Sequence, residues 1–74
     1  MLIKLVTKSS TEIDSVATGA NVRTARRKVN MSLRELSRRM GCSAPYVSDL
    51  ELGRRNWNPI TFTLACKLIN QYKP

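Results

Sequence analysis

Apolar residues recur at helical spacing in the middle of the chain, beginning at about Ala20. Val22, Ala25 and Val29 lie three or four residues apart, with basic and polar residues between them. This spacing predicts an amphipathic helix that buries one stripe of side chains. Asn30 interrupts the pattern, so we expect the first helix to end there.

A second helix follows, and its ends are marked by residues that cap helices. The run Ser32–Glu35 matches a capping box, in which the serine hydroxyl and the glutamate carboxylate each satisfy an otherwise unpaired amide. Leu33, Leu36 and Met40 form one apolar stripe. Gly41 can adopt the left-handed conformation that ends a helix, so we expect a sharp turn there.

The third predicted helix has boundaries of the same kind. Ser43 is a suitable N-cap, and Pro45 is tolerated in the first turn because an amide there has no partner within the helix. Val47 and Leu50 form its buried stripe, and Gly53 closes the helix after about residue 52.

A fourth helix is predicted after a basic loop. Asn58 is its N-cap and Pro59 its first residue, and the helix ends near Tyr72. Trp57 precedes the cap, where a large apolar side chain acts as a hydrophobic staple against Phe62 or nearby core residues. The apolar positions of this helix recur at helical spacing: Phe62, Ala65, Leu68 or Ile69, and Tyr72.

The N-terminal part of the chain has a different pattern. Leu2–Val6 is rich in Leu, Ile and Val, which favours a short strand. Residues 7–21 are mostly polar and predict an irregular linker, with Ile13 and Val16 as anchors against the rest of the protein. We therefore expect an N-terminal arm over residues 1–19 and a helical domain over residues 20–74.

Two helices of about nine residues joined by a short glycine turn form a helix-turn-helix. The residues that must be apolar or glycine for such helices to cross closely are present: Leu36, Met40, Gly41, Cys42, Val47 and Leu50. The predicted fold is all-α, a compact bundle of four or five helices that contains a helix-turn-helix and carries an extended arm or short β-strand at its N-terminus.

Charge and composition narrow the function. The 74 residues carry a net charge of +8, and nine basic residues face three acidic ones between Arg23 and Arg55. Such a concentration of positive charge is typical of a polyanion partner, and a solvated charged surface is the alternative. No histidine is present, which argues against an enzyme and against a bound metal or other cofactor.

The two cysteines, Cys42 and Cys66, lack metal-binding spacing and favour a reduced intracellular protein, although one disulfide between them is the alternative. The apolar start of the chain is too short to span a membrane, and no signal-peptide pattern follows it. We therefore expect a cytoplasmic protein.

The segment LRELSRRMGCSAPYVSDLELG resembles the lambda-repressor-like helix-turn-helix family, also called the Xre or Cro/C1 type. The resemblance extends from about Val22 to Ile69. It implies a bacterial or phage-encoded transcriptional regulator, most simply a repressor, that inserts helix 43–52 into the major groove of double-stranded DNA. Such a protein is expected to associate with the nucleoid when it is bound to DNA. It also implies an ion pair between an arginine of the first helix and a glutamate near the end of the recognition helix, here Arg26 and Glu51.

In this family the N-terminal part of the recognition helix contacts bases. The residues at those positions are Ser43, Ala44, Pro45, Tyr46, Ser48 and Asp49. Many family members have Gln or Arg at positions 33, 44, 45 and 49, where side chains bind purines at two points, and this chain has neither there. Small and apolar side chains can instead touch thymine methyl groups, and Asp49 can accept from cytosine N4. Ser43 as a cap, Pro45 as a helix starter and Asp49 as a solvated side chain are the alternatives.

Phosphate contacts are expected around the recognition helix. The family contacts the DNA backbone from the loop that follows this helix and from the N-terminal end of the second helix. Arg34 and Arg38 either add to this grip or are simply solvated. The expected phosphate-binding residues are Ser32, Arg34, Arg38, Arg54, Arg55 and Asn56.

One domain of this size contacts few base pairs, so the family generally binds inverted repeats as a homodimer. The dimer would form either through the C-terminal end of the fourth helix or by pairing of the Leu2–Val6 strands, unless that strand folds back on its own domain. The alternative function is an antitoxin-type module, in which residues 7–18 fold on a protein partner while the same domain binds its operator.

Overall fold

Four helices make up most of the computed structural model, which describes residues 3–9 and 12–73. Their bounds are Ser15–Lys28 for α1, Leu33–Met40 for α2, Ala44–Leu52 for α3 and Pro59–Gln71 for α4. Each helix begins after a residue whose side chain accepts a hydrogen bond from the amide three positions on: Asp14, Ser32, Ser43 and Asn58. The all-α fold and the caps predicted for the last three helices are confirmed.

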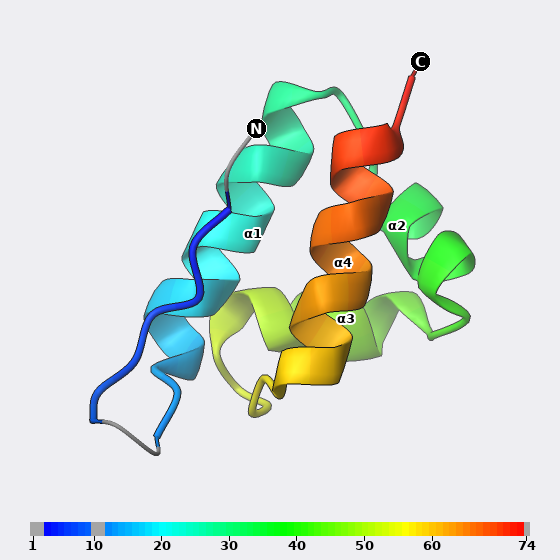
Figure 1. The fold of residues 1–74 in the computed structure, drawn as a ribbon. Coiled ribbons are helices and arrows are strands. Elements are labelled where there is room, and N and C mark those ends of the chain that lie inside the picture. The colour runs from blue at the N-terminus through cyan, green and yellow to red at the C-terminus, as the bar shows by residue number, and fades with distance from the viewer. Residues whose placement is uncertain (1–2, 10–11, 74) are drawn as a thin grey trace.

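The helices pack around α3 and one apolar core (Figure 1). α3 contacts α1 and α2, and α4 lies in front of α3 against α1 and α2. The centres of the predicted stripes are buried, and Ile69 rather than Leu68 is the fully buried residue of its pair. Four residues of the stripes are half-buried: Val29, Leu33, Phe62 and Tyr72. The fully buried apolar side chains of the core include Val22, Leu36, Val47, Leu50 and Ile69.

The turns between the helices follow the sequence pattern. Gly41 and Gly53 adopt φ values of 73° and 79°, the left-handed conformation that a Cβ disfavours. Trp57 is 3% exposed and meets Phe62 edge-on, with ring centroids 6.1 Å apart. Its indole Nε1 donates to the Leu50 carbonyl at 2.9 Å. The predicted staple is therefore confirmed, and it also anchors the loop to the C-terminal half of α3.

The first helix begins five residues before the predicted start, inside the segment that we expected to be arm and linker. Asp14 caps it by accepting from the Ala17 amide at 3.1 Å. The spacing of apolar residues does not indicate the start of α1, because the buried residues there are polar or small: Ser15, Thr18 and Gly19. Ile13 packs against the core as expected, and Val16, although 61% exposed, packs closely against Gly53 at the end of α3.

Gly19 sets the distance between α1 and α3. A Cβ at this position would lie 2.5 Å from the Glu51 carbonyl oxygen and would also meet that of Leu50. Atoms at such a separation repel strongly, so only glycine lets α1 approach the C-terminal end of α3 this closely. This contact fixes the C-terminal end of α3 against α1.

The N-terminal segment is extended but is not part of a sheet, so the predicted strand is wrong over residues 3–6; Leu2 lies outside the described residues. Within residues 3–9 and 12–73, Thr7 and Ile13 form one isolated antiparallel bridge. The segment lies along α1 (Figure 1), where the Thr18 hydroxyl accepts from the Val6 amide at 2.9 Å. The alternative that this segment folds back on its own domain is the one that the structure shows.

Candidate nucleic-acid interface

α2, the glycine turn and α3 form the helix-turn-helix, and the turn leaves the N-terminal half of α3 at the surface. The Cys42 amide donates to the Ser37 carbonyl at 2.9 Å, which fixes the direction in which α3 departs. Ser43 and Pro45 are exposed, and the other candidate base-contacting residues, Ala44, Tyr46, Ser48 and Asp49, are half-buried. All six predicted residues thus retain some access to solvent along one helix.

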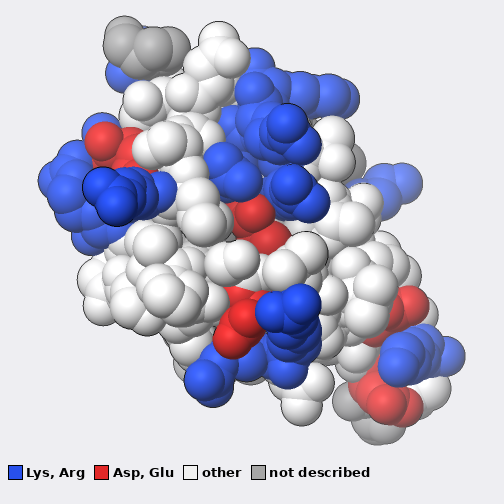
Figure 2. Space-filling model, turned by 180° about the vertical axis from the view of Figure 1, so that it is seen from behind, with Lys and Arg blue, Asp and Glu red and all other residues white. Residues whose placement is uncertain are grey.

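Basic side chains surround this surface in separate groups. Figure 2 shows the face opposite to that of Figure 1, with blue groups over α1, over α2 and around the loop after α3, and mostly uncharged surface between them. Several exposed arginines come from these elements: Arg23, Arg27, Arg34, Arg38, Arg54 and Arg55. This arrangement suits a polyanion that lies across α3 and is held on several sides.

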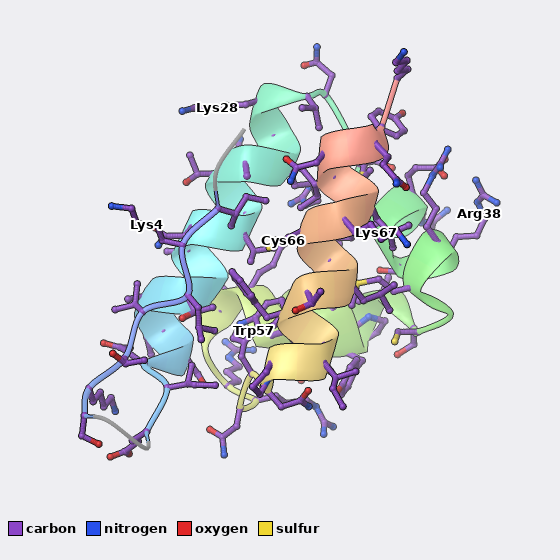
Figure 3. The ribbon with its side chains drawn as sticks, in the orientation of Figure 1. Lys4, Lys28, Arg38, Trp57, Cys66 and Lys67 are labelled. Carbon is purple, nitrogen blue, oxygen red and sulfur yellow. The ribbon has the colours of Figure 1, made fainter. Side chains whose placement is uncertain are left out.

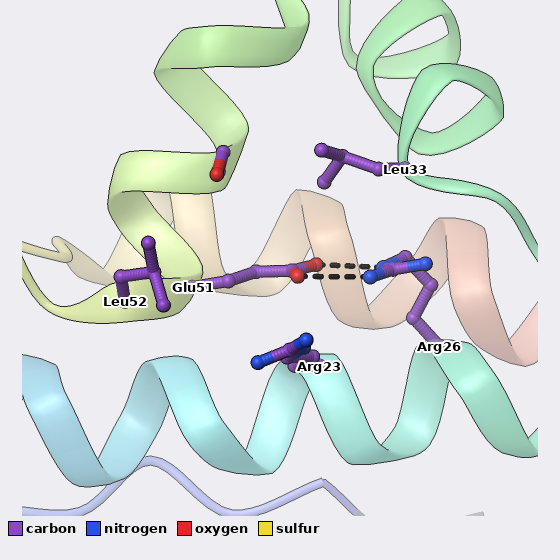
Figure 4. A pocket seen from close by; sticks show the side chains of 6 residues that line it. Arg23, Arg26, Leu33, Glu51 and Leu52 are labelled. Atoms are coloured by element: carbon purple, nitrogen blue, oxygen red, sulfur yellow. Dashed lines mark hydrogen bonds and ion pairs between the residues drawn. The ribbon is translucent and has the colours of Figure 1, made fainter.

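Arg23 and Arg27 were missed as candidate phosphate-binding residues. Both lie on the exposed side of α1, and Arg23 lines a small hollow with Leu33 of α2 and Leu52 of α3 (Figure 4). The signal was present in the sequence, because basic residues occupy most positions between Val22 and Val29. The family resemblance places phosphate contacts only on the second helix and in the loop after the third helix, so it does not single out these two arginines.

Arg26 and Glu51 form the ion pair that the resemblance implied (Figure 4). Arg26 Nε donates to Glu51 Oε2 at 2.7 Å and Nη2 donates to Oε1 at 3.0 Å. Arg26 Nη1 donates to the Met31 carbonyl at 2.8 Å. The two side chains are only 10% and 3% exposed, so this pair joins helices and is not a free contact for DNA.

The two arginines of the loop after α3 rest against α3. Arg54 Nη1 lies 3.8 Å from Asp49 Oδ1, and Arg55 Nε lies 3.8 Å from Asp49 Oδ2. The Arg55 guanidinium also stacks over the Tyr46 ring, 5.0 Å from its centroid. A residue expected to contact bases, Asp49, therefore shares its charge with two residues expected to contact phosphates.

The basic group of α2 is organised by Glu35. Its carboxylate accepts from Arg39 Nε at 2.6 Å and also from Arg38. The hydrogen bond from Arg39 is the largest cause that lowers the pKa of Glu35 below its ordinary value. The reciprocal half of the predicted capping box is therefore wrong: the Ser32 hydroxyl caps the Glu35 amide at 3.0 Å, but the Glu35 carboxylate turns to the arginines.

Arg34 and the N-terminal end of α2 are accessible to a DNA phosphate. Arg34 is exposed, and Arg38 is exposed although it binds Glu35. Asn56 is also exposed, in the loop before Trp57. The predicted phosphate-binding residues are thus all at the surface but differ in how strongly neighbouring acids hold them.

The structure also bears on metal binding, on the two cysteines and on membrane-spanning helices. Within residues 3–9 and 12–73, no group of three or more His, Cys, Asp or Glu side chains is arranged to hold a metal ion. Cys42 and Cys66 are not bonded to each other, and partial burial raises the pKa of the Cys66 thiol. None of the helices in the described part is long and apolar enough to cross a membrane.

The N-terminal half of α4 exposes two apolar side chains. Ile60 is 82% exposed and Leu64 is 39% exposed. We call these two residues, with Pro59, Thr63 and Lys67 beside them, the α4 patch. It begins three residues after the basic loop, and Lys67 is visible on α4 in Figure 3. Apolar side chains exposed in a group of this kind are typical of a contact surface.

The comparisons with known proteins agree with this geometry. The family model described as helix-turn-helix matches residues 22–73, which include α2, α3, α4 and more than a third of α1. Neither the curated proteins nor the solved structures gave a significant match. Because the match covers well over half of the chain, the protein belongs to the helix-turn-helix family of the Xre, lambda-repressor-like type, whose domain is DNA-binding and regulates transcription.

Proposed function

We propose that this protein is a transcriptional repressor that inserts α3 into the major groove of a specific operator and binds there as a homodimer. The observation that carries the proposal is the exposed N-terminal half of α3, surrounded by arginines from α1, α2 and the loop after α3. An α-helix fits the major groove, and flanking arginines reach the phosphates on both sides of it.

Most of the affinity for DNA comes from contacts with its sugar-phosphate backbone. Arg54, Arg55 and Asn56 contact phosphates from one side, and the amides at the start of α2 near Ser32 contact another phosphate. Arg34 and Arg38 extend this contact. We add Arg23 and Arg27 because both are exposed and line hollows beside Leu52 of α3. These contacts supply affinity and register but do not distinguish sequences.

Sequence is read by the exposed side chains of α3. Pro45 and the ring of Tyr46 suit thymine methyl groups, and Ser43 or Ser48 donates to a base edge. Ser43 also caps α3 by accepting a hydrogen bond from the Tyr46 amide at 3.3 Å. We therefore expect Ser43 to contribute less than Ser48 to base recognition. The bidentate purine contacts available to Gln or Arg are absent from these positions, so we expect a T-rich half-site.

The α4 patch supports the dimer. A second copy that covers Ile60 and Leu64 would bring the two basic loops close together, because the patch directly follows that loop in the chain. The predicted C-terminal end of α4 is less suitable, since Tyr72 is half-buried beneath Arg39, whose guanidinium lies 5.2 Å from the ring centroid. Pairing through residues 3–6 is also disfavoured, because the Val6 amide and carbonyl already bind α1 or its cap.

The same contacts argue against the antitoxin alternative. That hypothesis needs residues 7–18 to fold only on a partner, but Asp14 caps α1 and Thr18 is fully buried without one. We therefore retain the repressor as the proposed function.

The test is a fluorescence-anisotropy titration against the DNA directly upstream of the gene, with scrambled DNA as the control, at two salt concentrations. We expect binding to the upstream DNA to be at least about a hundredfold tighter than to the scramble. Ser48→Ala or Tyr46→Ala should remove most of this difference, and Asn70→Ala, at an exposed position of α4 outside the α4 patch, should not. Equal and steeply salt-dependent binding to both DNAs would refute sequence-specific binding.

Oligomeric state is tested separately by sedimentation equilibrium with and without operator DNA. Ile60→Lys should shift the protein towards monomer and weaken operator binding, whereas Gln71→Lys adds the same charge at the far end of α4 and should change neither. A wild-type protein that remains monomeric on an inverted repeat would refute the homodimer.

A further inference from the structure

Asp49 is an acidic residue on the recognition helix, at the edge of the basic surface. Its side chain is 35% exposed, and its two carboxylate oxygens lie 3.8 Å from Arg54 and from Arg55 respectively. The arginines are themselves 71% and 56% exposed. The free protein therefore holds an anion where DNA is expected, and two loop arginines neutralise that anion.

These ion pairs are of a kind that is readily exchanged. A separation of 3.8 Å is long for an ion pair, and exposed pairs contribute little because water screens them and long side chains lose freedom. A DNA phosphate offers the same guanidinium groups shorter, charge-assisted hydrogen bonds. Arg54 and Arg55 can thus leave Asp49 for the backbone at low cost.

The exchange has a consequence for Asp49. Once the arginines bind phosphates, the carboxylate faces the base edges without a counter-charge, and only an amino group can satisfy it. Cytosine presents N4 as a donor, whereas guanine presents two acceptors and thymine presents a carbonyl and a methyl group. Adenine presents a donor next to the N7 acceptor, which would repel the second carboxylate oxygen.

We propose that Asp49 is a specificity-determining residue that couples base reading to the phosphate contacts: cytosine N4 satisfies the Asp49 carboxylate once Arg54 and Arg55 have left it for the DNA backbone. This inference rests on the proposed DNA-binding function. On a site without cytosine the carboxylate is left without a partner when the arginines bind phosphates, so that site is bound more weakly. The Tyr46 ring under Arg55 guides that arginine along α3 in either state.

The coupling gives a distinctive expectation for Asp49→Asn. The amide no longer holds the arginines and no longer excludes guanine or thymine, so binding to random DNA should become several-fold tighter while selection weakens. Glu12→Gln is the matched control, because Glu12 is exposed, lies outside the helices and loses the same charge. A general effect of net charge would appear equally in both variants.

The experiment is selection from randomised duplexes by the wild type, Asp49→Asn and Glu12→Gln, followed by titration of the selected site and its single-base variants. We expect the wild type to prefer cytosine at one position of each half-site by about tenfold or more. The preference should fall below about threefold in Asp49→Asn and persist in Glu12→Gln. Thermal unfolding and circular dichroism verify that both variants fold.

Two other outcomes overturn the inference in different ways. If the wild type selects a site and Asp49→Asn selects the same site with the same cytosine preference, the role of Asp49 is refuted while the proposed function stands. The same holds if Glu12→Gln loses the preference to the same extent. If the wild type selects no sequence, the proposed function fails and this inference fails with it.

Discussion

Arg26 and Glu51 lie 25 residues apart in the chain and bind each other at two points, with N–O distances of 2.7 and 3.0 Å. The pair joins the C-terminal half of α1 to the last turn of α3 and is almost fully buried. Within the described part of the chain, no buried side-chain nitrogen or oxygen lacks a hydrogen-bond partner. Burial of two charges is tolerated here because each satisfies the other.

Removal of one partner should therefore be costly. Glu51→Ala leaves the Arg26 guanidinium buried without its counter-charge, and we expect a loss of about 3–5 kcal/mol in the free energy of unfolding. The double variant Arg26→Met, Glu51→Leu should be markedly more stable than the single one, because no charge remains buried. Urea unfolding followed by circular dichroism measures both. Equal destabilisation in the single and double variants would contradict this account.

Gly19 and Gly41 should respond differently to alanine. In a helix, Gly→Ala normally stabilises by about 1 kcal/mol. At Gly19 the new Cβ would clash with two carbonyl oxygens of α3, so we expect a net loss of about 2–3 kcal/mol instead. Gly41→Ala meets no neighbouring atom and costs only about 1 kcal/mol of backbone strain. Denaturant unfolding of the two variants compares them, and a stabilised Gly19→Ala would show that α1 can move away freely.

Features of the fold that depend on residues close together in the sequence could be predicted, and features that depend on distant residues could not. The caps and glycine ends of α2 and α3 were predicted because each depends on hydrogen bonds between residues at most five positions apart. The first turn of α1 was not, because Thr18 and Gly19 are buried by hydrogen bonding and close backbone approach rather than by apolar spacing. Both depend on partners at Val6 and Leu50, which only the fold brings near.

The candidate site shows the same limit. The positions of α3 residues at the surface followed from helical spacing and family resemblance. The charge sharing among Asp49, Arg54 and Arg55 did not, because it depends on how the loop folds back over the helix after Gly53. Sequence reasoning treated these residues separately as base or phosphate contacts, and their joint behaviour became visible only in three dimensions.

The N-terminal segment should depend on one hydroxyl. Thr18 Oγ1 accepts from the Val6 amide at 2.9 Å, and Thr18→Val removes this bond while keeping the side-chain volume. We expect faster hydrogen exchange at the Val6 amide and easier proteolytic cleavage in residues 3–9, with the helices unchanged. Thr24→Val, at an exposed position of α1, is the control. Unchanged exchange at Val6 in Thr18→Val would mean that apolar contacts alone hold the segment.

Stability should also depend on pH through Glu35. The hydrogen bond from Arg39 lowers the pKa of Glu35 in the folded protein, so the carboxylate stabilises the fold above its ordinary pKa. This contribution is lost as the pH falls through the lowered folded value. The difference in unfolding free energy between the wild type and Glu35→Gln should therefore shrink from pH 7 to pH 3. A difference that is constant over this range would exclude a role for the Glu35 charge.

The basic side of α1 should contribute to DNA binding through charge alone. Arg23 is exposed and lies beside Ser48 of α3, whereas Lys4 is exposed on the N-terminal segment (Figure 3). Loss of one phosphate contact reduces the slope of log affinity against log salt by about 0.9. We expect this reduction for Arg23→Ala on specific and random DNA alike, and no reduction for Lys4→Ala. Salt titrations by anisotropy measure the slopes, and equal slopes for the two variants would place the DNA away from α1.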